Sequence, residues 1–113
     1  MHEWGLVETL LRRAEEKASE HGATAVRRLT VSIGALAGVE PDLFEAAWLE
    51  FRAGTLCANA ALEVRSVVAE WECPDCEAIV AAGGALRCAA CRKPLRLRAG
   101  GEILLERMEL EVP

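Results

Sequence analysis

Residues 73–91 have the sequence CPDCEAIVAAGGALRCAAC, which contains two C-x-x-C pairs, Cys73 with Cys76 and Cys88 with Cys91. The two-residue gap lets both sulfurs of a pair point to the same side of a turn, and two such turns supply four ligands in a tetrahedron. Four thiolates are a typical ligand set for structural Zn²⁺ and leave no open position for water or substrate. We therefore predict a structural zinc site at Cys73, Cys76, Cys88 and Cys91.

The same cysteines have other interpretations. A disulfide needs an oxidising compartment, whereas residues 1–10, MHEWGLVETL, lack the basic start and apolar run of a secretory signal. A rubredoxin-like iron site usually has Gly after each turn, where this chain has Glu77 and Arg92. A thiol oxidoreductase needs an exposed thiolate of low pKa, usually at a helix N-terminus. The fifth cysteine, Cys57, is interpreted as a small buried hydrophobic residue.

The cysteine module extends from about Glu70 to Ala99 and contains few apolar residues. Metal binding, worth about 10–16 kcal/mol in zinc peptides, would supply the folding free energy that such a small core lacks. Gly100-Gly101 is expected to be the hinge by which the chain leaves the module. We expect residues 1–69 and 100–113 to form one α+β domain, with residues 70–99 as a zinc-binding insert.

Hydrophobic periodicity predicts the first two elements of the α+β domain. Apolar residues at helical spacing between Leu6 and Ala18 predict an amphipathic helix that ends at Gly22. Residues 26–33 then alternate with a period of two, which predicts a half-buried strand. The expected inward side chains are those of Leu29, Val31 and Ile33, and the expected outward ones are those of Arg28, Thr30 and Ser32.

The second half of the domain is predicted in the same way. Pro41-Asp42 suits the first turn of a second helix, which Gly54 ends. Its expected core stripe is Leu43, Phe44, Ala47, Trp48 and Phe51. Residues 62–67 and 102–112 form two more strands, and the apolar phase of the last one slips near Glu106-Arg107, which predicts a β-bulge.

These elements define an α+β fold class. We expect a small three-stranded mixed sheet with two helices on one face, plus an inserted four-cysteine, zinc-ribbon-like module that joins the last two strands. The chain has 113 residues, enough for one compact unit and a small insert.

Composition narrows the classes of partner. The formal net charge of −5 argues against nucleic acid, because phosphate binding is driven by clustered Lys and Arg. One basic stretch, Arg92, Lys93, Arg96 and Arg98, is expected to bind protein and not nucleic acid, since no aromatic stacking residues flank it. No apolar run approaches the ~20 residues that span a bilayer. We therefore expect a cytoplasmic protein without a membrane partner.

The N-terminus offers a second set of metal donors. The Met1 α-amine, the His2 backbone nitrogen and the His2 imidazole can close adjacent five- and six-membered chelate rings, and the Glu3 backbone nitrogen or carboxylate could be the fourth donor. Nitrogen-rich, square-planar sites suit Ni²⁺ or Cu²⁺, not Zn²⁺. The only other histidine, His21, precedes Gly22 and is interpreted as a surface residue near the negative end of a helix.

Together, Met1-His2-Glu3 and the late cysteine pairs resemble the hydrogenase maturation nickel chaperones of the HypA/HybF type, over nearly the whole chain. The segment from Val31 to Phe44 and the return through Gly100-Gly101-Glu102 into a terminal strand are also similar to that family. In the family, the N-terminal His binds nickel with the terminal amine and adjacent backbone nitrogens. The four cysteines hold structural zinc.

The resemblance implies a metallochaperone that delivers Ni(II) to the active site of a [NiFe] hydrogenase and, in some bacteria, to urease. Its implied partners are the hydrogenase large subunit and a nickel-insertion GTPase. By the same resemblance, His2, Met1 and Glu3 bind nickel, and residues 1–69 with 100–113 become the nickel-binding domain.

Two other functions use the same cysteines: a zinc-ribbon adaptor that binds protein without nickel, and a thiol oxidoreductase. Zinc with one labile nickel would support the chaperone, zinc alone the adaptor, and titratable thiols without metal the oxidoreductase. We find no nucleophile paired with a base and no phosphate-binding Gly-rich loop in a supporting context. We therefore expect no catalytic residues and no enzyme.

Overall fold

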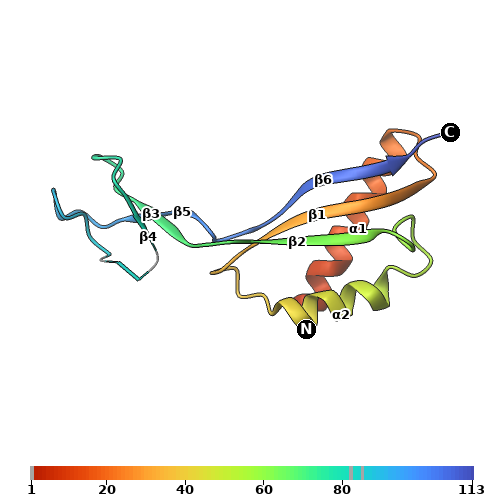
Figure 1. The fold of residues 1–113 in the computed structure, drawn as a ribbon, viewed down its shortest axis with the longest axis horizontal. Coiled ribbons are helices and arrows are strands. Elements are labelled where there is room, and N and C mark those ends of the chain that lie inside the picture. The colour runs from red at the N-terminus through yellow and green to blue at the C-terminus, as the bar shows by residue number, and fades with distance from the viewer. Residues whose placement is uncertain (1, 82, 85) are drawn as a thin grey trace.

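The computed structural model describes residues 2–81, 83–84 and 86–113, and Figure 1 shows an elongated molecule with a sheet near each end. Its extents are 56 × 28 × 17 Å. The elements in chain order are α1 (His2–Glu20), β1 (Ala25–Gly34), α2 (Pro41–Phe51), β2 (Ala61–Val67), β3 (Glu70–Glu72), β4 (Ile79–Ala81), β5 (Arg96–Ala99) and β6 (Ile103–Glu111). None of the helices in the described residues is long and apolar enough to cross a membrane.

The larger sheet has the strand order β2-β1-β6. Strand β1 is parallel to β2 and antiparallel to β6, so the sheet is mixed. Both helices cover the same face (Figure 1), and α2 lies in the crossover from β1 to its parallel neighbour β2. The predicted three-stranded mixed sheet with two helices on one face is confirmed.

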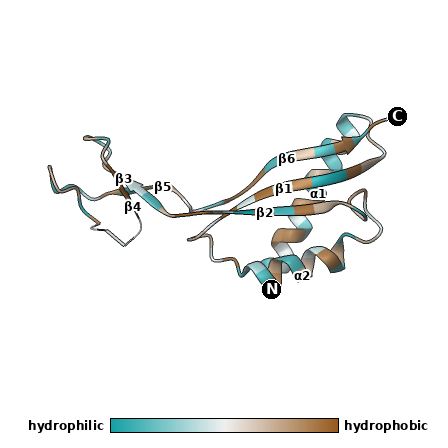
Figure 2. Cartoon of the chain, viewed as in Figure 1, coloured by the Kyte–Doolittle hydropathy of each residue, from teal (hydrophilic) through white to brown (hydrophobic). Residues whose placement is uncertain are grey.

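The hydrophobic core lies between this sheet and the two helices. Its largest buried side chains are those of Trp48 and Phe44 from α2, Leu29 and Val31 from β1, and Val7 from α1. Both helices carry hydrophobic and hydrophilic residues along their length (Figure 2), as amphipathic helices do.

The predicted core stripe of α2 is wrong at its first member. Leu43 is 43% exposed, whereas its neighbour Phe44 is fully buried. Adjacent residues are turned by about 100° around a helix axis. Because the buried face is set by Phe44, Ala47 and Trp48, the side chain of Leu43 is turned out of the core.

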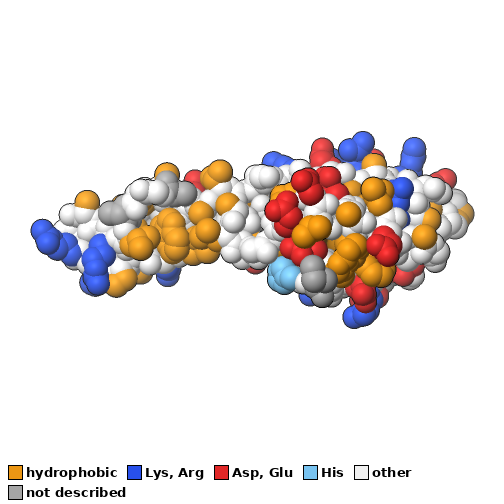
Figure 3. Space-filling model, turned by 90° about the horizontal axis from the view of Figure 1, so that it is seen from below, with side chains coloured by type: hydrophobic (Ala, Val, Ile, Leu, Met, Phe, Trp, Pro, Cys, Tyr) orange, Lys and Arg blue, Asp and Glu red, His pale blue; other side chains and the backbone are white. Residues whose placement is uncertain are grey.

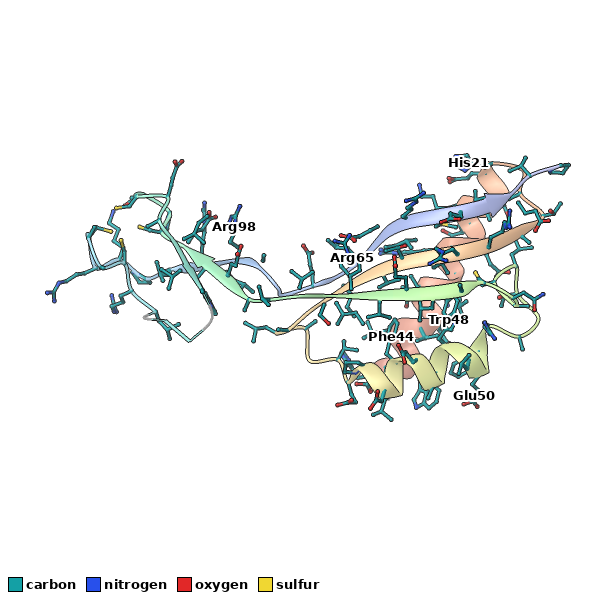
Figure 4. The ribbon with its side chains drawn as sticks, in the orientation of Figure 1. His21, Phe44, Trp48, Glu50, Arg65 and Arg98 are labelled. Carbon is teal, nitrogen blue, oxygen red and sulfur yellow. The ribbon has the colours of Figure 1, made fainter. Side chains whose placement is uncertain are left out.

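Strand β1 is buried on both faces at its end, which the two-residue alternation did not predict. Thr30 and Ser32, expected to point to solvent, are 6% and 2% exposed. Thr30 Oγ1 donates to Glu63 Oε1 at 3.2 Å. An ion pair of 3.3 Å joins Arg65 on β2 (Figure 4) to Glu106 on β6, and β1 runs between these two strands. Side chains from both neighbours therefore cover the central strand.

The β-bulge predicted near Glu106-Arg107 is confirmed. Thr30 pairs with Arg107 and Val31 pairs with Leu105, so Glu106 is the extra residue of β6. The bulge restores the phase of the strand, because Leu105 before it and Met108 after it both pack against the core. A second shift in register, between Val26 and Arg28, was not predicted.

A second sheet, of order β4-β3-β5, lies within residues 70–99. Trp71 of β3 pairs with Val80 on one side and with Leu97 on the other, which forms an apolar row across the sheet. Arg96 and Arg98 bond the carboxylates of Glu72 and Glu70 at 2.9 and 2.8 Å. These strands of three or four residues are too short for periodicity to predict them.

Two chain segments join the two sheets. One runs from the end of β2 to the start of β3, and the other from the end of β5 to the start of β6. The loop after β1 is hydrogen bonded to both of them: Ala35 N–H donates to Val67 O at 2.9 Å, and Leu36 N–H donates to Gly100 O at 2.8 Å. The segment expected to be a simple hinge at Gly100 is therefore bonded to the larger domain.

Candidate metal centre

Two turns with the same backbone carry the four cysteines. In the first knuckle, residues 73–78, Glu77 N–H donates to Cys73 O and Cys73 N–H donates to Ala78 O, both at 3.0 Å. In the second knuckle, residues 88–93, the equivalent bonds from Arg92 to Cys88 and from Cys88 to Lys93 are 2.8 and 2.9 Å. Each turn thus holds its first cysteine by the same pair of hydrogen bonds.

The two knuckles bring the four sulfurs together. All four Sγ atoms lie within 4.8 Å of one another, and Cys73 Sγ lies 3.5 Å from Cys91 Sγ. A regular tetrahedron with metal–sulfur bonds of about 2.3 Å has edges of about 3.8 Å, so the arrangement fits one four-coordinate metal ion. In the part of the chain that the structure describes, no other group of three or more His, Cys, Asp or Glu residues is close enough to hold a metal.

Hydrogen bonds set the acidity of these thiols. The backbone N–H groups of Cys91 and Ala90 lower the pKa of Cys88 to about 7. Contacts with the thiols of Cys91, Cys73 and Cys88 raise the pKa of Cys76 to about 12. A metal ion that binds these sulfurs as thiolates must displace the protons of the thiols.

A lysine side chain lies beside the cysteine cluster. Lys93 of the second knuckle forms an ion pair with Asp75 of the first. Its pKa is raised, mainly by Asp75 and further by the charge of the cysteine sulfurs. This ion pair links the two knuckles. Four thiolates around a divalent ion would carry a net charge of −2, which the ammonium group of Lys93 would partly offset.

The residue after each C-x-x-C pair adopts a left-handed conformation. The φ angles of Glu77 and Arg92 are 59° and 62°. This is the backbone region in which Gly is common. Both turns therefore form with charged residues at the positions where rubredoxin-like iron sites usually have Gly.

The fifth cysteine lies far from this cluster. Cys57 is fully buried in the core of the larger domain. Burial raises the pKa of its thiol to about 11, and the nearby Glu15 carboxylate adds to the shift.

The structure places the N-terminal residues at the start of α1. His2 is the first residue of the helix and is exposed, while Met1 lies outside the described residues. Glu3 is only 7% exposed, and its Oε2 accepts a hydrogen bond from Glu40 N–H at 3.1 Å. This bond is the main cause of a lowered pKa for Glu3. The carboxylate of Glu3 is therefore engaged at the start of α2, and sequence reasoning missed this contact.

The two remaining sets of predicted residues are His21 and the basic stretch. His21 is exposed near the end of α1, with Nδ1 2.9 Å from Lys17 O. In the basic stretch, Lys93, Arg96 and Arg98 form ion pairs with Asp75, Glu72 and Glu70. The stretch is therefore largely neutralised and is not a continuous basic patch.

The fold and the four-sulfur site define a class: a small α+β protein with an inserted four-cysteine metal module. A family model described as hydrogenase/urease nickel incorporation, metallochaperone, hypA matches residues 1–110. The chain belongs to this HypA family of nickel metallochaperones, which acts in hydrogenase maturation.

Individual relatives agree with this assignment. The hydrogenase maturation factor HypA of Aquifex aeolicus is 41% identical over 76 residues, which span 67% of this chain but only 66% of that protein. The HypA of Shewanella oneidensis is 32% identical over 98% of this chain and 96% of its own length. The solution structure of the Ni metallochaperone HypA from Helicobacter pylori has a TM-score of 0.78 at 27% identity, with 98% of both chains covered.

Proposed function

We propose that this chain is a nickel metallochaperone that binds Ni(II) through Met1, His2 and Glu3 and delivers it to the active site of a [NiFe] hydrogenase. The observation that carries the proposal is the family match, which spans residues 1–110 and so includes both the N-terminal triplet and all four paired cysteines. The similarity to a solved relative whose title describes it as a Ni metallochaperone supports the same function.

The contacts of Glu3 favour one of its two donors. Its carboxylate is buried and bonded to Glu40 N–H. Its backbone nitrogen lies in the first turn of α1, where N–H groups have no acceptor within the helix. We therefore propose the backbone nitrogens of His2 and Glu3, the His2 imidazole and the Met1 amine as the donors. Nickel can bind these nitrogens without breaking a hydrogen bond within α1.

We further propose that Cys73, Cys76, Cys88 and Cys91 hold structural Zn(II). Four thiolates in a tetrahedral arrangement suit zinc, and they leave no position for a substrate. In this proposal residues 70–99 are the zinc-binding module, and residues 1–69 with 100–113 are the nickel-binding domain. The proposed partners are the hydrogenase large subunit and a nickel-insertion GTPase, with urease as a second destination for the nickel.

A nickel titration of untagged protein tests the N-terminal site. Replacing His2 with Ala, or acetylating the Met1 amine, should abolish nickel binding while zinc content and fold stay unchanged, because each change removes a donor and no core contact. His21→Ala is the matched control and should bind nickel as the wild type does. Affinity should fall as the pH drops toward about 6, because nickel displaces protons from the amine and the imidazole.

Two results would contradict the proposal. Unchanged nickel affinity in the His2→Ala or acetylated protein would exclude the N-terminal donors. Wild-type protein with one zinc and no nickel binding would favour the zinc-ribbon adaptor instead.

A further inference from the structure

The two knuckles share one backbone but carry opposite charges. Residues 73–78 contain Asp75 and Glu77, whereas the second knuckle and the residue before it contain Arg87, Arg92 and Lys93. Glu77 and Arg92 occupy equivalent positions, each with a left-handed φ and each exposed. The difference between the two turns is therefore one of side-chain charge and not of fold.

Ion pairs neutralise most charges of the module, and the charged groups outside these pairs are the guanidinium groups of Arg87 and Arg92 and the carboxylate of Glu77. Among the described residues of 70–99, Lys93, Arg96 and Arg98 are paired with Asp75, Glu72 and Glu70. The salt bridges found in that part of the chain include neither Arg87 nor Arg92. Arg87 Nη1 instead donates to the backbone oxygen of Arg92 at 3.0 Å. This bond holds the Arg87 guanidinium against the backbone of the second knuckle, at the residue that carries the second guanidinium.

The turn that contains Arg92 does not require the positive charge of this residue. A side chain in the left-handed region destabilises the fold relative to Gly. The equivalent hydrogen bonds of the first knuckle form with Glu77, so the turn does not require a cation. Figure 3 shows Lys and Arg side chains at the far end of the elongated molecule, with hydrophobic side chains beside them. One exposed apolar residue, Leu86 at 67%, directly precedes Arg87.

We propose that the second knuckle is a docking site for an acidic segment of a partner protein, with Arg87 and Arg92 as its carboxylate contacts. The planar guanidinium group matches a carboxylate with two parallel N–H donors. Leu86 provides an apolar contact beside them. The chain as a whole has a formal net charge of −5. These cations therefore form a local attractive region on a molecule that otherwise repels acidic proteins. The site does not depend on the nickel donors.

Fluorescence anisotropy with a labelled acidic peptide of Glu and Leu residues tests this site. The wild type should bind the peptide, and binding should weaken as salt rises, because exposed charge pairs are screened. Arg92→Gly should bind about fivefold more weakly, the upper range for one exposed ion pair. The double variant Arg87→Gln with Arg92→Gly should bind more weakly still.

The first knuckle supplies the matched control. Glu77→Gly makes the same backbone change at the equivalent position, and it should bind the acidic peptide as well as or more tightly than the wild type. Both glycine variants should keep their metal and melt at the same or a higher temperature, since Gly relieves the left-handed conformation. Arg87→Gln alone, which removes the side-chain bond to Arg92 O but leaves the backbone hydrogen bonds of the turn in place, should also weaken binding.

Several outcomes would overturn the proposal. The first is that the wild type does not bind the acidic peptide. The second is that Arg92→Gly and Glu77→Gly bind the acidic peptide with equal affinity. The third is that the wild type binds a matched peptide of Lys and Leu residues as tightly as the acidic peptide. Binding of a single-stranded oligonucleotide as tightly as the acidic peptide would assign the cations to nucleic acid instead. A nickel titration of Arg92→Gly separates the two proposals, because its nickel binding should be unchanged.

Discussion

Gly34 at the end of β1 lies so close to Gly100 that a Cβ atom at Gly34 would be 2.2 Å from the carbonyl carbon and oxygen of Gly100. Gly100 has a φ of +91°, and a Cβ there would lie 2.7 Å from the Cα of Ala69. The two glycines therefore let three chain segments meet where the two sheets join. The backbone bonds of Ala35 and Leu36 hold the same junction.

Gly34→Ala should destabilise the protein by about 2–4 kcal/mol, because the new methyl group meets backbone atoms that no side-chain rotation can move away. Urea denaturation followed by circular dichroism measures the change. Gly5→Ala is the control: nothing lies within 4 Å of its Cβ position on α1, so it should stabilise by about 0.5–1 kcal/mol. Equal stability of the wild type and Gly34→Ala would show that the junction yields easily.

Cys76→Ala should lose the metal of the module and the hydrogen-exchange protection of residues 70–99, because three sulfurs cannot complete a tetrahedral site. The larger sheet and its helices should stay protected. Metal content by mass spectrometry and hydrogen exchange measure both effects. Cys57→Ala is the comparison, and it should keep its metal with a modest loss of core packing. If Cys57→Ala lost its metal, or if Cys76→Ala kept a full complement of metal, the ligands would be assigned wrongly.

The thiol of Cys57 should resist alkylation in the folded protein. It is fully buried, and burial raises its pKa to about 11, so roughly one molecule in a thousand carries the thiolate at pH 8. Peptide mapping after iodoacetamide treatment, with and without urea, measures the reaction. Modification at equal rates in both conditions would contradict the burial of this side chain.

Glu3→Gln should reduce stability near neutral pH and have less effect in acid. The folded state lowers the pKa of Glu3 from its ordinary value of 4.5. The carboxylate therefore contributes stability above pH 4.5, and this contribution is lost as the pH falls through the lowered value. Urea midpoints of the wild type and Glu3→Gln, compared at each pH between about 3 and 7, should converge at the acid end. Glu8→Gln, an exposed change on the same helix, should leave the midpoint unchanged.

The sequence predicted the larger sheet and its two helices well because these strands and helices are long enough to show a period. The slip near Glu106 even predicted the bulge that the register confirms. The predicted exposure of Thr30 and Ser32 was wrong for a physical reason. Alternation shows which face of a strand is apolar, but it does not show whether the strand lies at the centre or at the edge of the sheet. Only the topology shows that β1 is central and covered from both sides.

The candidate site was predictable in its ligands and not in its surroundings. Cysteine spacing identified the four residues whose sulfurs the structure brings together. The ion pair of Lys93 with Asp75 and the bond from Glu40 to Glu3 join residues far apart in the chain, so no local pattern reports them. The left-handed φ angles of Glu77 and Arg92 were not predicted, because charged residues do not favour this conformation as Gly does.

The inserted module also changes how quickly the larger sheet can assemble. Strand β6 completes that sheet next to β1, yet the chain between β2 and β6 contains the whole second sheet. Pairing of β3 with β5 brings Glu70 beside Ala99, so a module that is already folded shortens the loop that β6 must close. Closing a loop about fivefold shorter costs about 1.4 kcal/mol less chain entropy. Metal that binds the cysteines early would fold the module and so hold the start of β6 near the end of β2. Refolding of the larger sheet should therefore be slower when metal is withheld.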